Sequence, residues 1–296
     1  MAEQKDGNGT AYDHHDPARG QARRMRRLVD IRPQRASRLL LGALPIVALL
    51  LVYLLASEAR HAANPADKVL PTFAAMAQAA HDFTTQRDPA TDRILLVADT
   101  LASLYRLGIG LAIATATALI LGLLLGTVPL ARALLGPMVA IIAVIPPVAV
   151  LPILFIVLGL DEASKIALIA IGIAPFMTRD LTGFVTGLPA EQFAKAQTLG
   201  ANSWQLAIRV ALPQLMPRLI EALRLSMGPA WVFLIAAEAV ASDVGLGYRI
   251  FLVRRYFAMD IILPYVAWIS LLAILADALL MAISRRGFPW AHGAGR

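Results

Sequence analysis

The residues of this chain that could do chemistry are few, and the carboxylates among them lie inside or beside long apolar runs. Asp277 stands alone in the run LLAILADALLMAI, toward its cytoplasmic end. An ionisable residue inside a membrane span is a functional candidate, so Asp277 could carry a proton or a coupling ion. It could equally pair with a basic or hydroxyl group of another helix. Glu238 and Asp243 follow an earlier apolar run, where they could shape a gate or form a solvated helix end.

Motifs for catalysis or cofactor binding are absent from the sequence. The chain has no G-x-x-x-x-G-K-[ST] phosphate loop, no G-x-S-x-G nucleophile turn and no H-E-x-x-H metal pair. It has no cysteine, and its five histidines are scattered without metal-ligand spacing. We therefore predict a protein that is not an enzyme and that holds no cofactor or metal of its own.

The composition is that of a membrane protein. Of 296 residues, 58% are hydrophobic and only 16% are charged, against about a quarter charged in ordinary soluble domains. A helix needs about 20 apolar residues to cross a bilayer. Six stretches meet or approach this length: 39–56, 100–128, 133–158, 163–178, 222–241 and 262–283. The sequence predicts an all-α protein with six transmembrane helices, the third of them kinked or broken by Pro146, Pro147 and Pro152.

The distribution of Lys and Arg predicts the orientation, because cytoplasmic loops are enriched in both. The N-terminal tail holds seven arginines between Arg23 and Arg38, and Arg285 and Arg286 follow the last span, so both termini are expected in the cytoplasm. We divide the chain into a disordered basic cytoplasmic tail (1–36), a first transmembrane helix with a periplasmic segment (37–98), a core transmembrane domain (99–285) and a cytoplasmic C-terminal tail (286–296).

Four arginines lie away from the predicted cytoplasmic side. Arg249, Arg254 and Arg255 fall on the outside against the general bias, where they could attract an anion, contact an acidic partner or be ordinary exposed charges. Arg106, early in the second span, is expected to extend its guanidinium to the outer interface.

One compact polar segment, AEQFAKAQTLGANSWQLAIRVALP at 190–213, lies between the fourth and fifth spans and is therefore cytoplasmic. It predicts two short helices: Pro189 begins the first, Gly200 ends it, and Asn202 with Gln205 caps the second. Pro213 is expected to close the segment. A structured loop, a DNA-binding helix-turn-helix and a docking element for a soluble partner are the alternatives. Too few basic residues are present for phosphate contacts, so no nucleic-acid partner is expected.

The segment resembles the EAA loop of permease subunits of bacterial ATP-binding-cassette importers. Gly200, Val210, Leu212 and Pro213 have the spacing of that motif. The similarity extends over roughly 95–290, through TLASLYRLGIG, IPPVAVLPILFIVLGL, LGANSWQLAIRVALPQLMP, AWVFLIAAEAVASDVGLGY and SRRGFPW, to the nitrate/sulfonate/taurine branch. One departure is clear: the glutamate of Glu-Ala-Ala falls at Ala194, and Lys195 replaces an alanine. Glu191 lies one helical turn earlier.

The resemblance implies a MetI-like permease fold in the bacterial inner membrane. It implies a second copy of the chain, a periplasmic solute-binding protein, and a cytosolic ATPase dimer that binds ATP and Mg²⁺ and contacts the coupling loop at 189–213. The coupling residues are then Glu191, Ala194, Lys195, Ala196, Gly200, Ala201, Leu212 and Pro213, and the pathway or gate candidates are Glu238, Asp243, Gly245, Gly247 and Asp277. The solute would be small and anionic or zwitterionic. Two alternatives remain: a secondary transporter driven by an ion gradient through Asp277, and a membrane scaffold that only anchors partners.

Overall fold

The computed structural model describes residues 35–292 except 65–66, 88–91 and 93. The predicted tail at 1–36 therefore lies almost entirely outside the described residues, as do the last four residues of the C-terminal tail. The described residues form helices joined by short connections. The chain divides into two units, one ending at Leu55 and the other beginning at Ala56.

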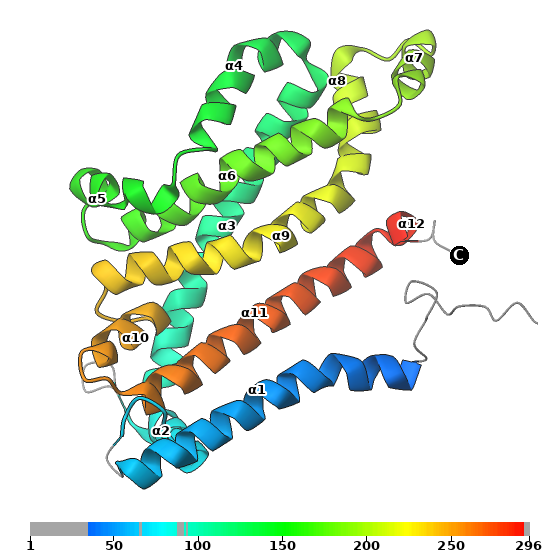
Figure 1. The fold of residues 1–296 in the computed structure, drawn as a ribbon. Coiled ribbons are helices and arrows are strands. Elements are labelled where there is room, and N and C mark those ends of the chain that lie inside the picture. The colour runs from blue at the N-terminus through cyan, green and yellow to red at the C-terminus, as the bar shows by residue number, and fades with distance from the viewer. Residues whose placement is uncertain (1–34, 65–66, 88–91, 93, 293–296) are drawn as a thin grey trace, which may run out of the picture. The chain divides into compact units, whose positions relative to one another are not determined.

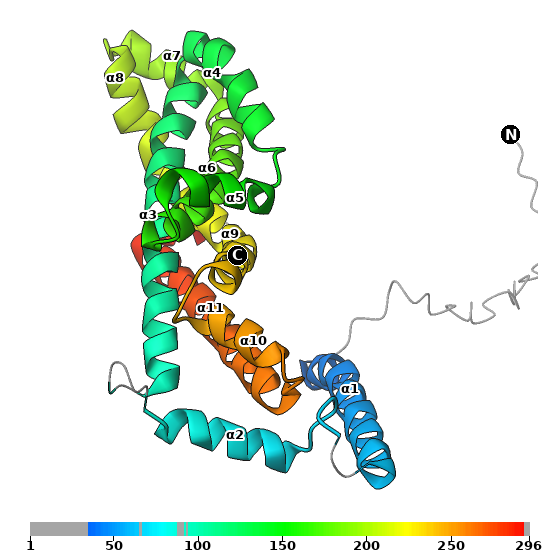
Figure 2. The same ribbon diagram turned by 90° about the vertical axis from the view of Figure 1, so that its left-hand side faces the viewer.

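Helix α1 spans Arg35–Ala63 and is long and apolar enough to cross a membrane. Near its C-terminal end, Ser57 donates its hydroxyl to the carbonyl of Leu70 at 3.0 Å, which holds the chain that follows the helix against α1. Helix α2 (Phe73–Thr85) follows, capped by the Thr72 hydroxyl. Figure 2 shows α2 lying across the end of α3.

Three long helices, α3 (Leu95–Thr127), α6 (Glu162–Thr186) and α9 (Leu212–Val240), pack side by side (Figures 1 and 2). Small residues allow the close approach of α3 and α6. A Cβ atom at Gly110, Gly122 or Gly126 of α3 would lie within 2.5–2.7 Å of side chains on α6. The buried core runs along these contacts and includes Ile169, Met177 and Leu181 of α6.

The predicted third span is broken. Helices α4 (Pro129–Ile142) and α5 (Pro147–Leu158) meet at an angle of 95°, with Pro146 and Pro147 at the break, as expected for residues that cannot continue a helix. With this pair counted as one span, the described residues contain six candidate spans, in agreement with the hydropathy pattern. Helix α11 (Met259–Gly287) is the last of them, preceded by the short α10 (Leu246–Arg254) and followed by α12 (Pro289–His292).

The polar segment differs from its prediction at one end. It contains α7 (Ala190–Thr198), α8 (Ser203–Gln205) and a π-helical turn (Leu206–Ala211) that runs directly into α9. Pro213 therefore does not close the segment. The π-helical turn resets the hydrogen-bond register, with the Leu212 N–H donating to Ala207, so Pro213 falls in the first turn of α9, where its missing N–H is tolerated. Ser203–Val240 is one continuous helix of 38 residues, much longer than the span predicted at 222–241.

Candidate functional site: an outer ion network and an inner polar segment

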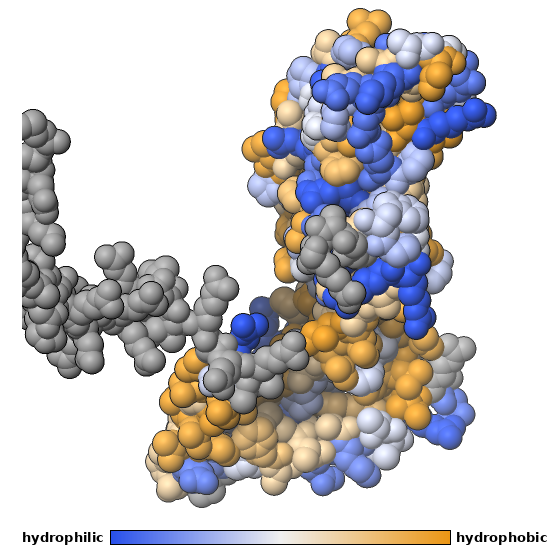
Figure 3. Space-filling view, turned by 90° about the vertical axis from the view of Figure 1, so that its right-hand side faces the viewer, coloured by the Kyte–Doolittle hydropathy of each residue, from blue (hydrophilic) through white to orange (hydrophobic). Residues whose placement is uncertain are grey.

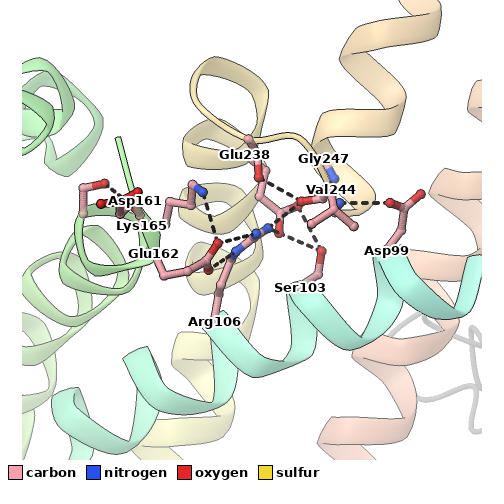
Figure 4. Close-up of polar contacts among 12 residues, drawn as sticks. Asp99, Ser103, Arg106, Asp161, Glu162, Lys165, Glu238, Val244 and Gly247 are labelled. Carbon is pink, nitrogen blue, oxygen red and sulfur yellow. Dashed lines mark hydrogen bonds and ion pairs between the residues drawn. The ribbon is translucent and has the colours of Figure 1, made fainter. Parts of the chain in front are cut away.

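Buried charged groups gather where α9 ends, on the side that the charge distribution assigns to the outside and that is called the outer end below. Glu238 has no exposed surface. Its carboxylate accepts hydrogen bonds from the Ser103 hydroxyl at 2.7 Å, the Arg106 Nη1 at 2.7 Å and the Gly247 backbone N–H at 2.8 Å (Figure 4). The interpretation of Glu238 as a solvated helix end is therefore wrong.

Arg106 connects three helices. From α3 it donates to Glu162 of α6 at 2.5 and 2.7 Å and to Glu238 of α9, and it also donates to the Val244 carbonyl at 2.8 Å. Its side chain is only 2% exposed, so the prediction that it reaches the outer interface is wrong. The physical reason is that two carboxylates meet the guanidinium inside the bundle and compensate for its lost hydration.

A second buried carboxylate, Asp99, lies one turn before Ser103 on α3. It accepts from the Gly245 N–H at 3.0 Å, from Arg249 Nε at 2.9 Å and from the Tyr265 hydroxyl at 3.1 Å. One of the alternatives for Arg249 was an ordinary exposed charge. Its hydrogen bond to Asp99 excludes that alternative. Partial burial opposes the charge of this guanidinium, but its hydrogen bonds to Asp99 and the attraction of nearby negative charge, mainly that of Asp99, together outweigh that effect, so the pKa of Arg249 lies above its ordinary value.

Together these groups hold the start of α10. The successive N–H groups of Gly245, Leu246 and Gly247 donate to Asp99, Ser103 and Glu238 respectively. The first N–H groups of a helix have no partner within it, and the positive end of the helix dipole favours carboxylates there. We call Asp99, Ser103, Arg106, Glu162, Glu238 and Arg249 the outer network.

Neither Gly245 nor Gly247 has room for a side chain. Gly245 has a φ of +136°, and a Cβ there would lie 2.6 Å from Glu238 Cδ. A Cβ at Gly247 would lie 2.9 Å from the Ile235 backbone. The predicted gate candidates Glu238, Gly245 and Gly247 are thus brought together by the fold. Asp243, by contrast, is exposed and lies outside these contacts.

The sequence interpretation missed most of the outer network. Asp99, Ser103 and Arg106 are polar residues at spacings of four and three in an apolar helix, which places them on one face. That spacing was the available signal. Their partners Glu238 and Gly245 lie more than 130 positions later in the chain, and nothing in the local pattern identifies them.

The inner polar segment has the predicted caps. Gly200 has a φ of +84°, and the N–H groups of Gly200 and Ala201 donate to the carbonyls of Gln197 and Ala196 at 2.9 and 3.0 Å. These two bonds form a Schellman motif, which ends α7. Asn202 and Gln205 exchange backbone-to-side-chain bonds of 2.9 and 3.0 Å, which confirms the capping box.

Several of the predicted coupling residues form an exposed surface on this segment. Glu191, Ala194, Lys195, Gly200 and Pro213 are exposed, while Ala196, Ala201 and Leu212 are partly buried. Two large apolar side chains are exposed beside them, Leu199 at 88% and Trp204 at 73%. Figure 3 shows apolar and hydrophilic side chains next to one another at the end that carries α7 and α8. Aromatic side chains are enriched at surfaces that bind other proteins, so the exposed Trp204 favours a docking surface here.

Side-chain amides attach α7 to α9. Gln214 donates through Nε2 to the Gln192 side chain at 2.9 Å and to the Val210 carbonyl at 2.8 Å. Phe193 of α7 packs against the buried core. The polar segment is therefore joined to α9 by the continuous chain and also by these side-chain contacts.

Asp277 has a partner within the bundle. Arg224 of α9 donates to both of its carboxylate oxygens, at 2.8 and 2.9 Å. This is the pairing with a basic group of another helix that was one of the two predicted alternatives. A carboxylate held in a bidentate ion pair is poorly suited to carry a coupling ion or a proton.

Among the residues the structure describes, no group of three or more His, Cys, Asp or Glu side chains is arranged to hold a metal ion. The charges of the outer network are instead satisfied by one another.

Comparison with known proteins identifies the family. Residues 105–287 match the family described as "Binding-protein-dependent transport system inner membrane component". The chain is 35% identical over 193 residues to the taurine transport system permease protein TauC of Escherichia coli (strain K12), covering 65% of this chain and 70% of TauC. It is 29% identical over 189 residues to the putative aliphatic sulfonates transport permease protein SsuC of Bacillus subtilis (strain 168), covering 64% and 68%.

The fold is also that of a solved transporter. The structure described as inward-facing conformations of the MetNI methionine ABC transporter superposes with a TM-score of 0.58 at 21% identity, over 68% of this chain and 99% of the solved one. The secondary-transporter alternative is set aside by these matches. From the span pattern, the inner polar segment and the family match, we conclude that this chain belongs to the family of binding-protein-dependent inner-membrane components, as a multi-pass permease subunit of an ABC importer in the taurine, sulfonate and nitrate branch.

Proposed function

We propose that this chain, paired with a second copy, forms the membrane channel for a small anionic or zwitterionic solute of the nitrate, sulfonate or taurine kind. A periplasmic binding protein delivers the solute to the outer end. A cytosolic ATPase dimer, which binds ATP and Mg²⁺, contacts the coupling loop at 189–213 and supplies the energy.

The main support for this proposal is a helix that runs without interruption from the inner polar segment to the outer network. Ser203–Val240 begins inside the exposed polar segment and ends two residues after Glu238 in the outer network. At about 1.5 Å per residue, a helix of 38 residues is about 57 Å long, which exceeds the thickness of a bilayer. A displacement of the segment can therefore be passed to the outer end along one continuous helix. Rigid-body tilting of this kind alternates access in transporters.

The contact with the ATPase is expected to use shape and apolar surface more than the motif glutamate. Ala194 occupies the position of that glutamate, and Lys195 is exposed beside it. Leu199 and Trp204 offer exposed apolar area on the same segment. Glu191 is exposed one turn earlier, and its carboxylate is available to a basic residue of the partner.

The test is uptake into proteoliposomes that contain this chain, its ATPase and its binding protein. We expect uptake of labelled taurine or nitrate that requires ATP and continues when an uncoupler abolishes the proton gradient. Uptake that persists without ATP and stops with the uncoupler would instead support a gradient-driven transporter. Partners that assemble around the chain without any uptake would support a scaffold.

A further inference from the structure

Two exposed arginines of the outer end have no part in the outer network. Arg254 is the last residue of α10 and Arg255 follows it, and both are exposed. Neither forms an ion pair with any residue that the structure describes, including Asp260, the next acidic residue along the chain. Two adjacent positive charges are therefore available on the side of the membrane where Lys and Arg are generally sparse.

Two exposed aromatic rings adjoin these arginines. Tyr256 is 71% exposed and Phe257 is 68% exposed. The N–H of Tyr256 donates to the Val253 carbonyl at 3.0 Å, and the N–H of Phe257 donates to the Arg254 carbonyl at 3.1 Å. Phe257 has a φ of +52°, which is uncommon for a bulky residue. The rings are thus exposed on a hydrogen-bonded turn.

A third ring positions one of the arginines. The guanidinium of Arg254 lies 4.8 Å from the centroid of the Phe251 ring, within the range of a cation–π interaction. This contact holds the guanidinium without a hydrogen bond to any other side chain of the described chain. The N–H donors of Arg254 therefore remain available to an acceptor outside the protein.

The turn lies where the last candidate span begins. Helix α11 starts at Met259, two residues after Phe257, and α12 lies at its opposite end (Figure 1). At about 1.5 Å per residue, the 29 residues of α11 are about 44 Å long, which matches a bilayer with both of its headgroup layers. The start of α11 and the turn before it therefore lie at the level of the outer headgroups.

The chemistry of the turn fits an anionic phospholipid at this level. A guanidinium carries several N–H donors in a fixed plane, which suits it to the oxygens of a phosphate. Aromatic rings are enriched at the headgroup level, where their apolar parts meet the lipid. A soluble anion would satisfy the arginines and leave the rings in water. A lipid satisfies the arginines and covers the rings.

We propose that Arg254, Arg255, Tyr256 and Phe257 form a binding surface for an anionic phospholipid of the outer leaflet. The phosphate binds the two arginines, and the glycerol and upper acyl region lie beside the two rings. The bound lipid holds the start of α11 at the membrane boundary. The surface also accounts for two arginines that the general charge bias does not predict on this side.

The experiment places a reporter in the surface itself. Phe257→Trp keeps an aromatic ring, and its fluorescence is the difference between this variant and the unchanged full chain. Bromine atoms in the acyl chains of neighbouring lipids quench it. The full chain is reconstituted in mixtures of phosphatidylglycerol, which is anionic, and phosphatidylcholine, with one or the other brominated. We expect phosphatidylglycerol to bind beside position 257 at least about tenfold more tightly, because each basic residue near an anionic headgroup contributes about fivefold.

Two charge variants of this reporter chain identify the groups responsible. In Arg254→Gln/Arg255→Gln the preference for phosphatidylglycerol should fall to about twofold or less, while brominated phosphatidylcholine still quenches because the ring remains. Arg285→Gln/Arg286→Gln is the matched control. It removes an adjacent pair of exposed arginines from the last turn of α11, at the opposite end of the helix, and should leave the preference at position 257 unchanged.

Equal binding of the two lipids, or a preference that survives the loss of Arg254 and Arg255, would overturn the proposal. Absence of quenching at position 257 would also overturn it, and a fluorescence change on adding the periplasmic binding protein would then assign the surface to that protein. Inorganic phosphate, added at matched ionic strength, should leave the preference intact. Loss of the preference with phosphate would show that the arginines bind a soluble anion instead.

Discussion

The guanidinium of Arg106 lies 2.7 Å from the carboxylate of Glu238, and neither side chain is more than 2% exposed. The pair joins α3 to α9 at the outer end, and Glu162 extends it to α6. The N–H of Gly247 donates to the same Glu238 carboxylate at 2.8 Å, so this buried pair also holds the start of α10.

Removing one partner of this pair should destabilise the protein strongly. We expect Glu238→Gln to lower the free energy of unfolding by about 3–5 kcal/mol, because it leaves a buried guanidinium with less compensating charge. The measurement is unfolding of the purified chain in mixed micelles.

The double variant Arg106→Met/Glu238→Met separates pairing from simple burial. The free energy of unfolding should fall less in the double variant than the sum of its falls in the two single variants, by at least about 1 kcal/mol. This is the coupling expected for residues in direct contact. Strictly additive losses would show that the pair contributes nothing beyond its separate side chains.

A methyl group at position 247 should disrupt the outer turn. In Gly247→Ala the new Cβ would lie 2.9 Å from the Ile235 backbone, which has no freedom to withdraw inside α9. We expect the free energy of unfolding to fall by about 1–3 kcal/mol, as for other overpacked sites. Gly108→Ala is the control, because a Cβ at Gly108 has no atom within 4 Å. Equal thermal stability of the two variants would argue against the close packing.

Gly200→Asp should abolish ATP-dependent uptake while the protein stays in the membrane. A Cβ at position 200 meets no atom within 4 Å, so the fold tolerates the side chain, although the φ of +84° adds some strain. The effect should therefore fall on the contact with the ATPase. Membrane fractionation and uptake are measured on the same vesicles, and uptake at the wild-type rate would remove position 200 from the coupling surface.

Asp277→Asn should leave ATP-driven uptake largely intact. Its carboxylate pairs with Arg224 at a partly exposed position, so the neutral amide removes a structural contact and no coupling group. Uptake rates with and without an uncoupler provide the measurement. A complete loss of transport in Asp277→Asn, with normal membrane levels, would show that Asp277 has a role in transport beyond this structural contact.

The sequence predicts those parts of the fold that depend on local chemistry. Hydropathy locates the six spans, Pro146 and Pro147 break the third, and Gly200 and Asn202 form the caps that their types favour. Each of these features is decided within a few residues along the chain.

The parts that depend on distant partners are not predictable in the same way. An arginine near the end of a span is expected to reach the interface when no buried carboxylate is near it. Arg106 is instead paired inside the bundle with Glu162 and Glu238, which lie more than 50 and 130 positions away in the sequence. The π-helical turn before Pro213 is likewise decided by how the segment joins α9. No local propensity distinguishes it from a helix end.

The central claim, that the segment at 189–213 contacts the ATPase, is tested most directly by cross-linking. The chain has no cysteine, so single cysteines can be placed without a background. Ala194→Cys, on the exposed side of α7, should cross-link to the ATPase subunit through a short bifunctional reagent, with a yield that changes when ATP is added. His81→Cys, exposed on α2, is the matched control at the outer end and should give no such product. A complex that transports normally but gives no product at 194, or gives as much at 81, would contradict the account.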